Sequence, residues 1–173
     1  MSNALFWHEE TDTFLYSFFS SMTVVQLERS TGTTLRSWGQ FSDWSFDPPE
    51  SQFDWQHGVT FTETGTLLLS THVSQESDEG VVREFELDEQ NKVLRQVWSF
   101  AEGDGIPALE YGEAHRLPGG NTLHNYGSTT RVREATPEGL VVWDLAWLDE
   151  QGEPLPAFIG RSLLLEDLYA FAP

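Results

Sequence analysis

Two histidines occupy similar places in this sequence and could do chemistry at one shared site. His57 ends the run Trp55-Gln-His, and His115 lies four residues after Tyr111. His57 precedes a threonine-led apolar run by nine residues, and His115 precedes another by seven. A neutral imidazole can act as a nucleophile or carry a proton, so the pair could hold a nucleophile and an anion-stabilising partner. The even offset predicts that both histidines lie on the same face of their strands. The alternative is that each is a strand-end histidine bonded to a loop carbonyl.

The runs that follow these histidines belong to a repeated phrase, which indicates the elements that position them. Thr13, Thr66 and Thr122 open the three copies, 53 and then 56 residues apart. Each copy continues with a second strand-like run, a turn, and an apolar run that ends in tryptophan (Trp38, Trp98 and Trp143). A unit of roughly 50 residues with four strand-sized segments is typical of a propeller blade. We expect the three tryptophans to occupy equivalent blade positions.

The local patterns favour strands throughout. Runs such as 82–87 nearly alternate apolar and polar residues, and no stretch keeps a 3.6-residue apolar period. We therefore expect an all-β protein of about three four-stranded antiparallel blades, half of a six-bladed β-propeller, in one partial domain over residues 1–173. The predicted blades cover 3–39, 57–100 and 113–147, with a C-terminal closing strand at 160–171. The first blade is expected to lack its full innermost strand.

Composition excludes several functions. The chain has 28 acidic and 9 basic residues, a net charge of −19 and no cysteine. Such a chain repels phosphate backbones, so no nucleic-acid partner is expected, and thiolate metal sites and disulfides are excluded. No apolar run is long enough for membrane insertion, and the first residues do not form a signal peptide. No metal site and no cofactor are predicted.

Three segments carry a family resemblance. Trp55-Gln-His-Gly, Arg116-Leu-Pro-Gly-Gly-Asn-Thr-Leu and Glu134-Ala-Thr-Pro-Glu-Gly-Leu-Val-Val-Trp resemble the bacterial arylsulfate sulfotransferase family, and the resemblance covers nearly the whole chain. It implies a six-bladed propeller, of which this chain is the C-terminal half. It also implies transfer of a sulfuryl group between phenols through a sulfated histidine, without a nucleotide donor. The implied partner is a small aromatic sulfate or phenol, and the implied location is periplasmic or extracellular.

The resemblance assigns roles to individual residues. It implies that His57 is the catalytic nucleophile, and that the Asn of a His-x-Asn motif falls on Asn3. The His of that motif falls on Met1, and the family's Arg falls close to Phe19, so part of the family's site is absent here. The residues predicted to bind substrate are Asn3, His115, His72 and Arg116.

Alternatives stay open for several of these residues. His72 could be an outward-facing strand-end histidine, and Arg116 could pair with a neighbouring carboxylate. His8 and His124 are predicted to lie at the surface. The alternative function is a non-catalytic propeller scaffold that binds a ligand or protein partner, including stacking of a ring on Trp44 or Trp147. Because three blades leave two open ends, we expect a homodimer or additional N-terminal blades.

Overall fold

The computed structural model describes residues 1–163, and these fold into three β-sheets in chain order. The first sheet is antiparallel and has four strands, so the first blade does have its innermost strand, contrary to the prediction. Residues 2–8 form that strand, a run with four consecutive apolar residues that pairs with the next strand. The strands are β1 (Ser2–His8), β2 (Thr13–Phe18), β3 (Thr23–Glu28) and β4 (Thr34–Gly39).

The second sheet has five strands instead of the predicted four. Its antiparallel part follows the predicted second blade, beginning three residues earlier. The additional strand comes from the segment predicted as a connector and pairs in parallel with the outermost strand. The strands are β5 (Ser45–Asp47), β6 (Asp54–Phe61), β7 (Leu67–His72), β8 (Gly80–Asp88) and β9 (Val93–Phe100).

The third sheet is again antiparallel with four strands: β10 (Glu113–Arg116), β11 (Thr122–Asn125), β12 (Arg131–Ala135) and β13 (Val141–Ala146). Residues 160–163 form no strand, and the rest of the predicted closing strand lies outside the described residues. The helical elements of residues 1–163 are three 3-10 turns: η1 (Phe19–Ser21), η2 (Pro49–Ser51) and η3 (Gly127–Thr129). No helix in this part of the chain could cross a membrane.

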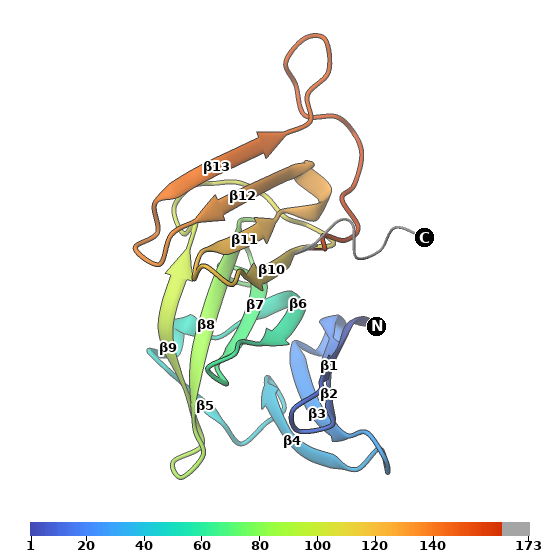
Figure 1. Cartoon of the computed structure of the whole chain (residues 1–173), viewed down its shortest axis with the longest axis vertical. Helices are drawn as coiled ribbons and strands as arrows, with labels where there is room; N and C mark the ends of the chain where they lie inside the picture. The colour runs from blue at the N-terminus through green and yellow to red at the C-terminus, as the bar shows by residue number, and fades with distance from the viewer. Residues whose placement is uncertain (164–173) are drawn as a thin grey trace.

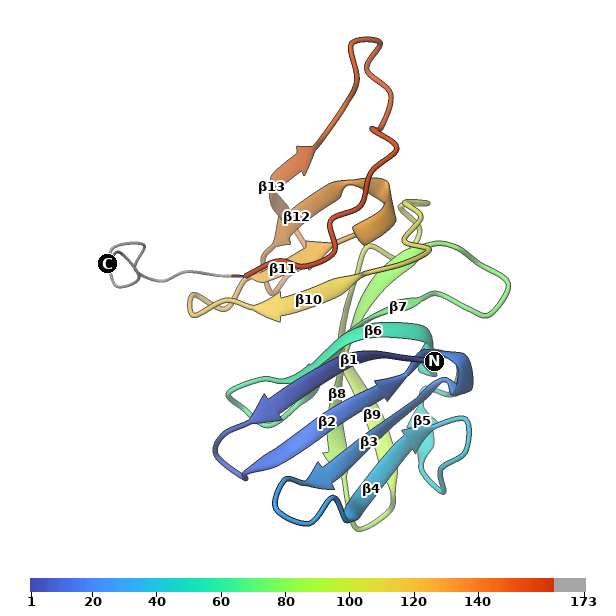
Figure 2. The same ribbon diagram turned by 90° about the vertical axis from the view of Figure 1, so that its right-hand side faces the viewer.

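The sheets pack face to face in a fanned stack (Figure 1). Figure 2 looks at the inner edge of this stack, where β10, β6 and β1 lie one above another. These are the first strands of the antiparallel ladders in blades three, two and one. The first residues of each repeat therefore come together at one edge, as in the centre of a propeller.

Two apolar cores hold the stack together. Between blades one and two, Leu15, Trp38 and Phe53 are fully buried with other apolar residues, including Leu67 and Leu69. Between blades two and three, Leu68 packs with a second cluster. Successive residues of β7 therefore point to opposite neighbours, and all six residues of this strand are buried. Burial on both faces explains its nearly continuous leucine run.

The three repeat tryptophans lie on the outermost strands β4, β9 and β13. Trp38 packs into the core shared with blade two, and Trp98 packs beside the core shared with blade three. Trp143 points to the opposite side from Asp144, whose carboxylate accepts bonds from Arg131. All three indoles therefore lie on the face directed toward the following blade, and Trp143 is 45% exposed.

The repeat register differs slightly from the threonine pattern. Thr13 and Thr122 begin β2 and β11, but Thr66 lies in the hairpin loop one residue before β7. Its hydroxyl is bonded to Thr62 there, at 2.6 Å, so it belongs to the turn. The three threonines are therefore not equivalent. Counting back from them does not give His57 and His115 equivalent positions in their sheets.

Candidate functional site

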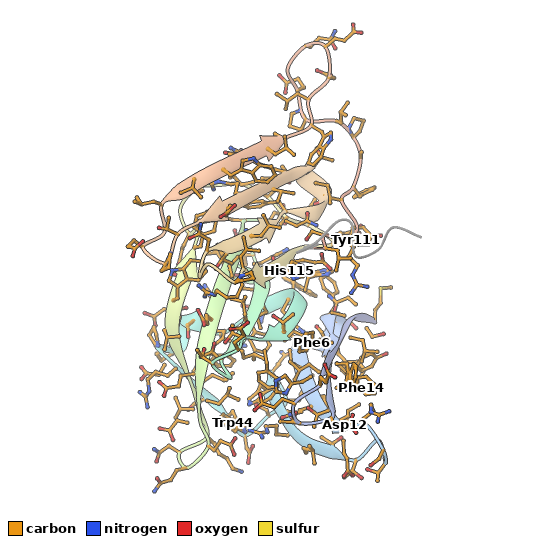
Figure 3. All side chains as sticks on the ribbon, in the orientation of Figure 1. Phe6, Asp12, Phe14, Trp44, Tyr111 and His115 are labelled. Carbon is orange, nitrogen blue, oxygen red and sulfur yellow. The ribbon has the colours of Figure 1, made fainter. Side chains whose placement is uncertain are left out.

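The predicted site residues from three different blades line one groove at the inner edge. Asn3 from β1, His57 from β6 and His115 from β10 border a cavity of about 720 Å³. We call this cavity the inner-edge groove; its other lining residues include Phe6, Thr60, Tyr111, Glu113 and Arg161. Figure 3 shows Phe6, His115 and Tyr111 on the side where β1, β6 and β10 meet. The groove therefore combines two imidazoles with apolar and aromatic walls.

Two glycines allow the innermost strands to come close enough to form this groove. Gly58 has a φ of +56°, and a Cβ on it would lie 2.7 Å from the Cα of Glu113. Gly112 is equally restricted, because a Cβ there would lie 2.4 Å from the Ser70 hydroxyl oxygen. A side chain at either position would push β10 away from blade two. The glycine that follows His57 is thus needed to bring His57 toward the third blade.

His57 is half-buried beside the ring of Phe19, with 5.2 Å between the ring centroids. Its Nε2 atom is buried and has no hydrogen-bond partner among the described residues, so no loop carbonyl holds this nitrogen. Burial, and secondarily the nearby His72, lower the pKa of His57 to about 4, although Glu113 acts in the opposite direction. The imidazole is therefore neutral at neutral pH, the state in which a ring nitrogen can attack an electrophile.

Gln56 anchors the strand that carries His57. Its side chain is fully buried, and its Nε2 donates to the Ser17 hydroxyl at 3.1 Å and to the carbonyls of Phe18 and Thr23 at 3.3 Å. These acceptors all belong to blade one. The glutamine of the Gln-His pair thus fixes β6 against its neighbour.

Asn3 bonds to the same strand. Its Nδ2 donates to the Gln56 carbonyl at 2.7 Å, while its Oδ1 is buried without a hydrogen-bond partner among residues 1–163. Buried amide oxygens are normally satisfied, so this atom is an unusual feature of the wall of the groove. The bond from Nδ2 ties β1 to β6 next to His57.

His115 forms a small polar cluster with Glu113. Its Nε2 lies 3.5 Å from a carboxylate oxygen of Glu113, which also accepts bonds from the backbone N–H and hydroxyl of Ser162 at 2.6 and 3.1 Å. Burial alone would raise the pKa of Glu113, but the bonds from His115 and Ser162 outweigh it and lower that pKa. The carboxylate is therefore ionised and can accept a hydrogen bond from the His115 ring. This pair is suited to move a proton at the groove.

His57 and His115 line the same groove from different heights. His57 pairs with Ser70 in the β6–β7 ladder, whereas His115 pairs with Leu123, nearer to its hairpin loop. The β6 strand is also irregular between His57 and Thr60. Both side chains line one groove because β6 and β10 lie side by side at the inner edge, although the two histidines do not hold equivalent places in the repeat.

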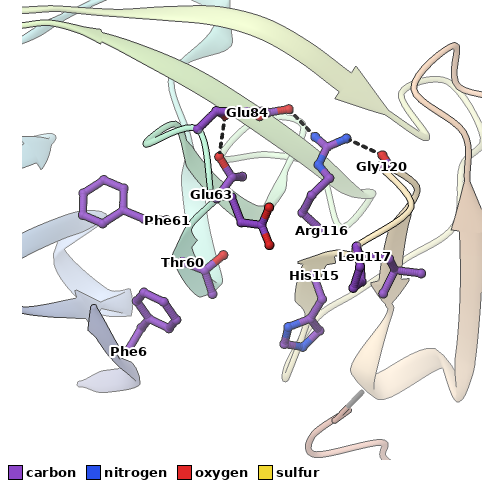
Figure 4. A pocket seen from close by; sticks show the side chains of 12 residues that line it. Phe6, Thr60, Phe61, Glu63, Glu84, His115, Arg116, Leu117 and Gly120 are labelled. Carbon is purple, nitrogen blue, oxygen red and sulfur yellow. Dashed lines mark hydrogen bonds and ion pairs between the residues drawn. The ribbon is translucent and has the colours of Figure 1, made fainter. Parts of the chain in front are cut away.

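Arg116 lines an adjoining groove of about 480 Å³, shown in Figure 4. Its guanidinium forms an ion pair with Glu84 and donates to the Gly120 carbonyl at 3.0 Å. It also lies 5.0 Å from the centre of the Trp98 ring. Its charge is paired with a carboxylate, as in the alternative given above. Arg116 links blades two and three and lines this adjoining groove instead of the inner-edge groove.

The structure does not bring His72 or His124 to the inner-edge groove. His72 is buried with its Nε2 2.9 Å from the Ala108 carbonyl, so it does not face outward as the alternative held, and it does not line the inner-edge groove. His124 is fully buried with its Nε2 3.0 Å from the Ser70 hydroxyl, contrary to the predicted surface position. His72 ends β7, and His124 lies within β11 on the face that packs against blade two. His8 is half-buried at the end of β1, bonded to Thr11.

Sequence reasoning missed the two charged residues that line the groove. Glu113 and Arg161 both line it, but Arg161 belongs to a segment without regular structure, for which no periodicity gives a position. The spacing of Glu113 from His115 was the one available signal, because residues two apart on a strand share a face. Among residues 1–163, no cluster of three or more histidine, aspartate or glutamate side chains could hold a metal ion.

Comparison with known proteins identifies the fold. No protein-family model matches the sequence, and no curated protein matches it either. A solved structure of the Cps50 (Swd1) β-propeller domain from Myceliophteria thermophila matches 84% of this chain with a TM-score of 0.55 and 14% identity. The aldose sugar dehydrogenase of Streptomyces coelicolor in its PQQ-bound form matches 80% with a TM-score of 0.54 and 15% identity. Streptogramin B lyase matches 83% with a TM-score of 0.51 and 8% identity.

These matches show an all-β fold that corresponds to part of a β-propeller. The chain spans 41%, 45% and 39% of the three matched chains. At such low identity the similarity extends to the fold alone, and the matched proteins include a lyase, a dehydrogenase and a propeller domain without a stated activity. The fold and the repeat are thus confirmed, and function has to be argued from the groove.

Proposed function

We propose that this chain is an arylsulfotransferase-like propeller in which His57 accepts a sulfuryl group from an aryl sulfate and passes it to another phenol. The observation that supports this most is the convergence of Asn3, His57 and His115 from three blades on one groove. The resemblance of the Trp55-Gln-His-Gly segment to the sulfotransferase family points to the same histidine. Apolar and aromatic wall residues such as Phe6 and Tyr111 suit a phenyl ring.

The proposed reaction has two balanced steps. In the first, a lone pair of the neutral His57 imidazole attacks sulfur, an N–S bond forms, and the aryl S–O bond breaks. The electron pair of that bond leaves with the phenolate, which takes a proton from the His115–Glu113 pair. In the second step, an acceptor phenol gives its proton back to this pair as its oxygen attacks sulfur. The N–S bond then breaks and neutral His57 is restored.

Each groove residue contributes in a distinct way. The lowered pKa keeps His57 unprotonated, so its imidazole has a lone pair for the attack. His115, held by Glu113, supplies and retrieves the proton. Asn3 is bonded to the backbone of the His57 strand and holds that strand at the groove.

Steady-state transfer tests this proposal. With 4-nitrophenyl sulfate as donor and phenol as acceptor, release of 4-nitrophenolate should require His57. His57→Ala should abolish it, while His8→Asn, an imidazole loss outside the inner-edge groove, should leave it unchanged. Equal rates in the two variants would contradict the proposal.

A second function is favoured by a different observation. Large apolar side chains are exposed on the outer faces of the stack, including Trp7 on β1 and Trp143 on β13. Such faces suit a propeller scaffold that binds a protein partner. If the protein shows no sulfuryl transfer with any phenolic pair but binds a partner through these faces, this second function replaces the first.

A further inference from the structure

The charge pattern of the molecule sets one basic residue apart. The sequence has nine lysine and arginine residues, and eight of them are engaged by partners in the structure. Seven form ion pairs with carboxylates, and Arg83 donates to the carbonyls of Gln52 and Val73. For Arg161, residues 1–163 provide no such partner. In so acidic a chain, a cation of this kind is the natural place for an anion to bind.

Arg161 lies at the wall of the inner-edge groove, together with His57 and His115. It arrives there on an irregular segment that follows β13. The Ile159 N–H donates to the Gly127 carbonyl at 3.0 Å, and Asn125 Nδ2 donates to the Ile159 carbonyl at 3.2 Å. We call residues 155–163 the strap.

The strap is held on both sides of Arg161. Ile159 is bonded to blade three, as just described, and Ser162 donates twice to the Glu113 carboxylate. The Glu113 carboxylate therefore contacts both His115 and Ser162, the residue next to Arg161. These bonds limit the backbone of Arg161 to the edge of the groove, while its side chain stays exposed.

The rest of the groove lacks a permanent positive charge. The pKa of His57 is lowered, so its imidazole is neutral. Phe19, near which the family resemblance places an arginine, brings an uncharged aromatic ring against His57. A sulfate ester keeps its negative charge throughout the reaction, and its oxygens need a cation or donors beside them. A guanidinium presents several N–H donors in one plane, which suits two oxygens of such a group.

We infer that Arg161 is the residue that binds the anionic group of the ligand, and that the strap is part of the binding site. This inference rests on the proposed function for the identity of the ligand, an aryl sulfate with its ring toward Phe6 and Tyr111 and its sulfate toward Arg161. The strap thereby makes the site selective for anionic aromatic ligands over neutral ones.

Binding measurements with two ligands test the inference. We would measure the Kd of 4-nitrophenyl sulfate and of uncharged 4-nitroanisole for the whole protein by calorimetry. Arg161→Gln should weaken sulfate binding roughly tenfold, the usual scale of one charge-assisted contact, without changing the Kd of 4-nitroanisole. Added salt should weaken sulfate binding to the wild type more than to the variant. Arg161→Lys should recover part of the loss.

A matched control separates this local effect from net charge. Arg131→Gln removes the same charge from β12, where Arg131 pairs with Asp144, and should leave both Kd values unchanged. The inference is overturned if Arg161→Gln leaves the Kd of 4-nitrophenyl sulfate unaltered, or if it weakens both ligands equally.

The two proposals fail in distinguishable ways. Unaltered sulfate binding in Arg161→Gln, together with loss of transfer in His57→Ala, would reject the role of Arg161 and keep the proposed function. Arg161-dependent sulfate binding without any transfer would keep the anion site and reject catalysis. If the wild type binds neither ligand, both proposals are wrong.

Discussion

At the scale of single residues, the environment of His57 determines how the site should respond to pH. Burial lowers its pKa to about 4, below the ordinary value of 6.5. The nucleophile is therefore unprotonated from about pH 4 upward. We predict that the acid limb of kcat/KM for 4-nitrophenyl sulfate has its midpoint near pH 4, since this parameter reports the free enzyme. A midpoint near 6.5 in stopped-time assays would show that His57 is solvated and that the described burial is wrong.

The close approach of β6 and β10 gives a second prediction at this scale. Gly58→Ala would place a Cβ 2.7 Å from the Glu113 Cα, whereas Gly65→Ala meets nothing within 4 Å, although both glycines have positive φ. The left-handed backbone alone costs about 1–2 kcal/mol for a non-glycine residue, so Gly65→Ala should lose about that much stability. Gly58→Ala should lose clearly more, because β10 must move. Urea unfolding of both variants measures the difference, and equal losses would mean that the strands are not in contact.

Sequence reasoning at the residue scale located His57, His115 and Asn3, which do share a groove. It did not predict the buried positions of His72 and His124, and it did not single out Arg161. A polar residue in β7 or β11 reads as a surface residue when one face of a strand is assumed to be solvated. However, β7 is buried on both faces, and His124 on β11 lies on the face that packs against Ser70 of blade two. The position of Arg161 depends on two hydrogen bonds of the strap: Ser162 donates to Glu113, and Asn125 donates to the Ile159 carbonyl. Such contacts between distant segments leave no local pattern in the sequence.

At the scale of the elements, the central strands carry buried imidazoles whose titration should affect stability. His124 is fully enclosed between blades two and three, and burial lowers its pKa to about 3. Between pH 6.5 and 3, the unfolded chain binds a proton that folded His124 does not. Folding is therefore destabilised as pH falls, by up to about 1.4 kcal/mol per pH unit for this histidine. The stability it contributes is present above pH 6.5.

The variant His124→Gln tests this effect, because it keeps an amide that can bond to Ser70 but removes the titrating ring. The free energy of unfolding should fall less steeply with decreasing pH in this variant than in the wild type between pH 6.5 and 4. His8→Asn serves as the control, since His8 lies at the end of β1 and its ring bonds Thr11 there. Parallel pH curves for His124→Gln and the wild type would contradict the buried position.

The elements themselves were largely predictable, because alternation and turn residues mark most strands of each repeat. The departures have particular causes. β5 forms from only three residues of a connector, and its pairing with β9 depends on tertiary contact. The innermost strand of blade one, residues 2–8, was not expected to be complete, yet it pairs with β2 over most of its length.

At the scale of the whole molecule, the two outer faces of the stack are unlike its two internal junctions. Trp38 is fully buried where blade two covers it, but Trp143, on the corresponding face of blade three, is 45% exposed. On blade one, Leu5 and Trp7 are 57% and 48% exposed. Closed propellers use about four to eight blades, so each outer face resembles a blade junction without its neighbour.

We therefore predict that the 173-residue chain associates in solution, with blade three of one copy covering blade one of another. Light scattering coupled to size exclusion should give the mass of a dimer at micromolar concentrations. Leu5→Glu combined with Trp7→Glu should give a monomer, because the charges oppose burial of this face. Phe41→Glu, a similar change in an exposed loop, should leave the dimer intact. A compact wild-type monomer that binds no hydrophobic dye would contradict this prediction.

The measurement that tests the central claim most directly is the mass of the protein after brief reaction with 4-nitrophenyl sulfate without an acceptor. The account predicts a gain of one SO₃ group, mapped by peptide sequencing to His57, which disappears when phenol is added. His57→Ala should gain nothing, and His8→Asn should be modified like the wild type. A stable SO₃ adduct on another residue, or none on His57 while 4-nitrophenolate is released, would contradict the claim that His57 carries the sulfuryl group.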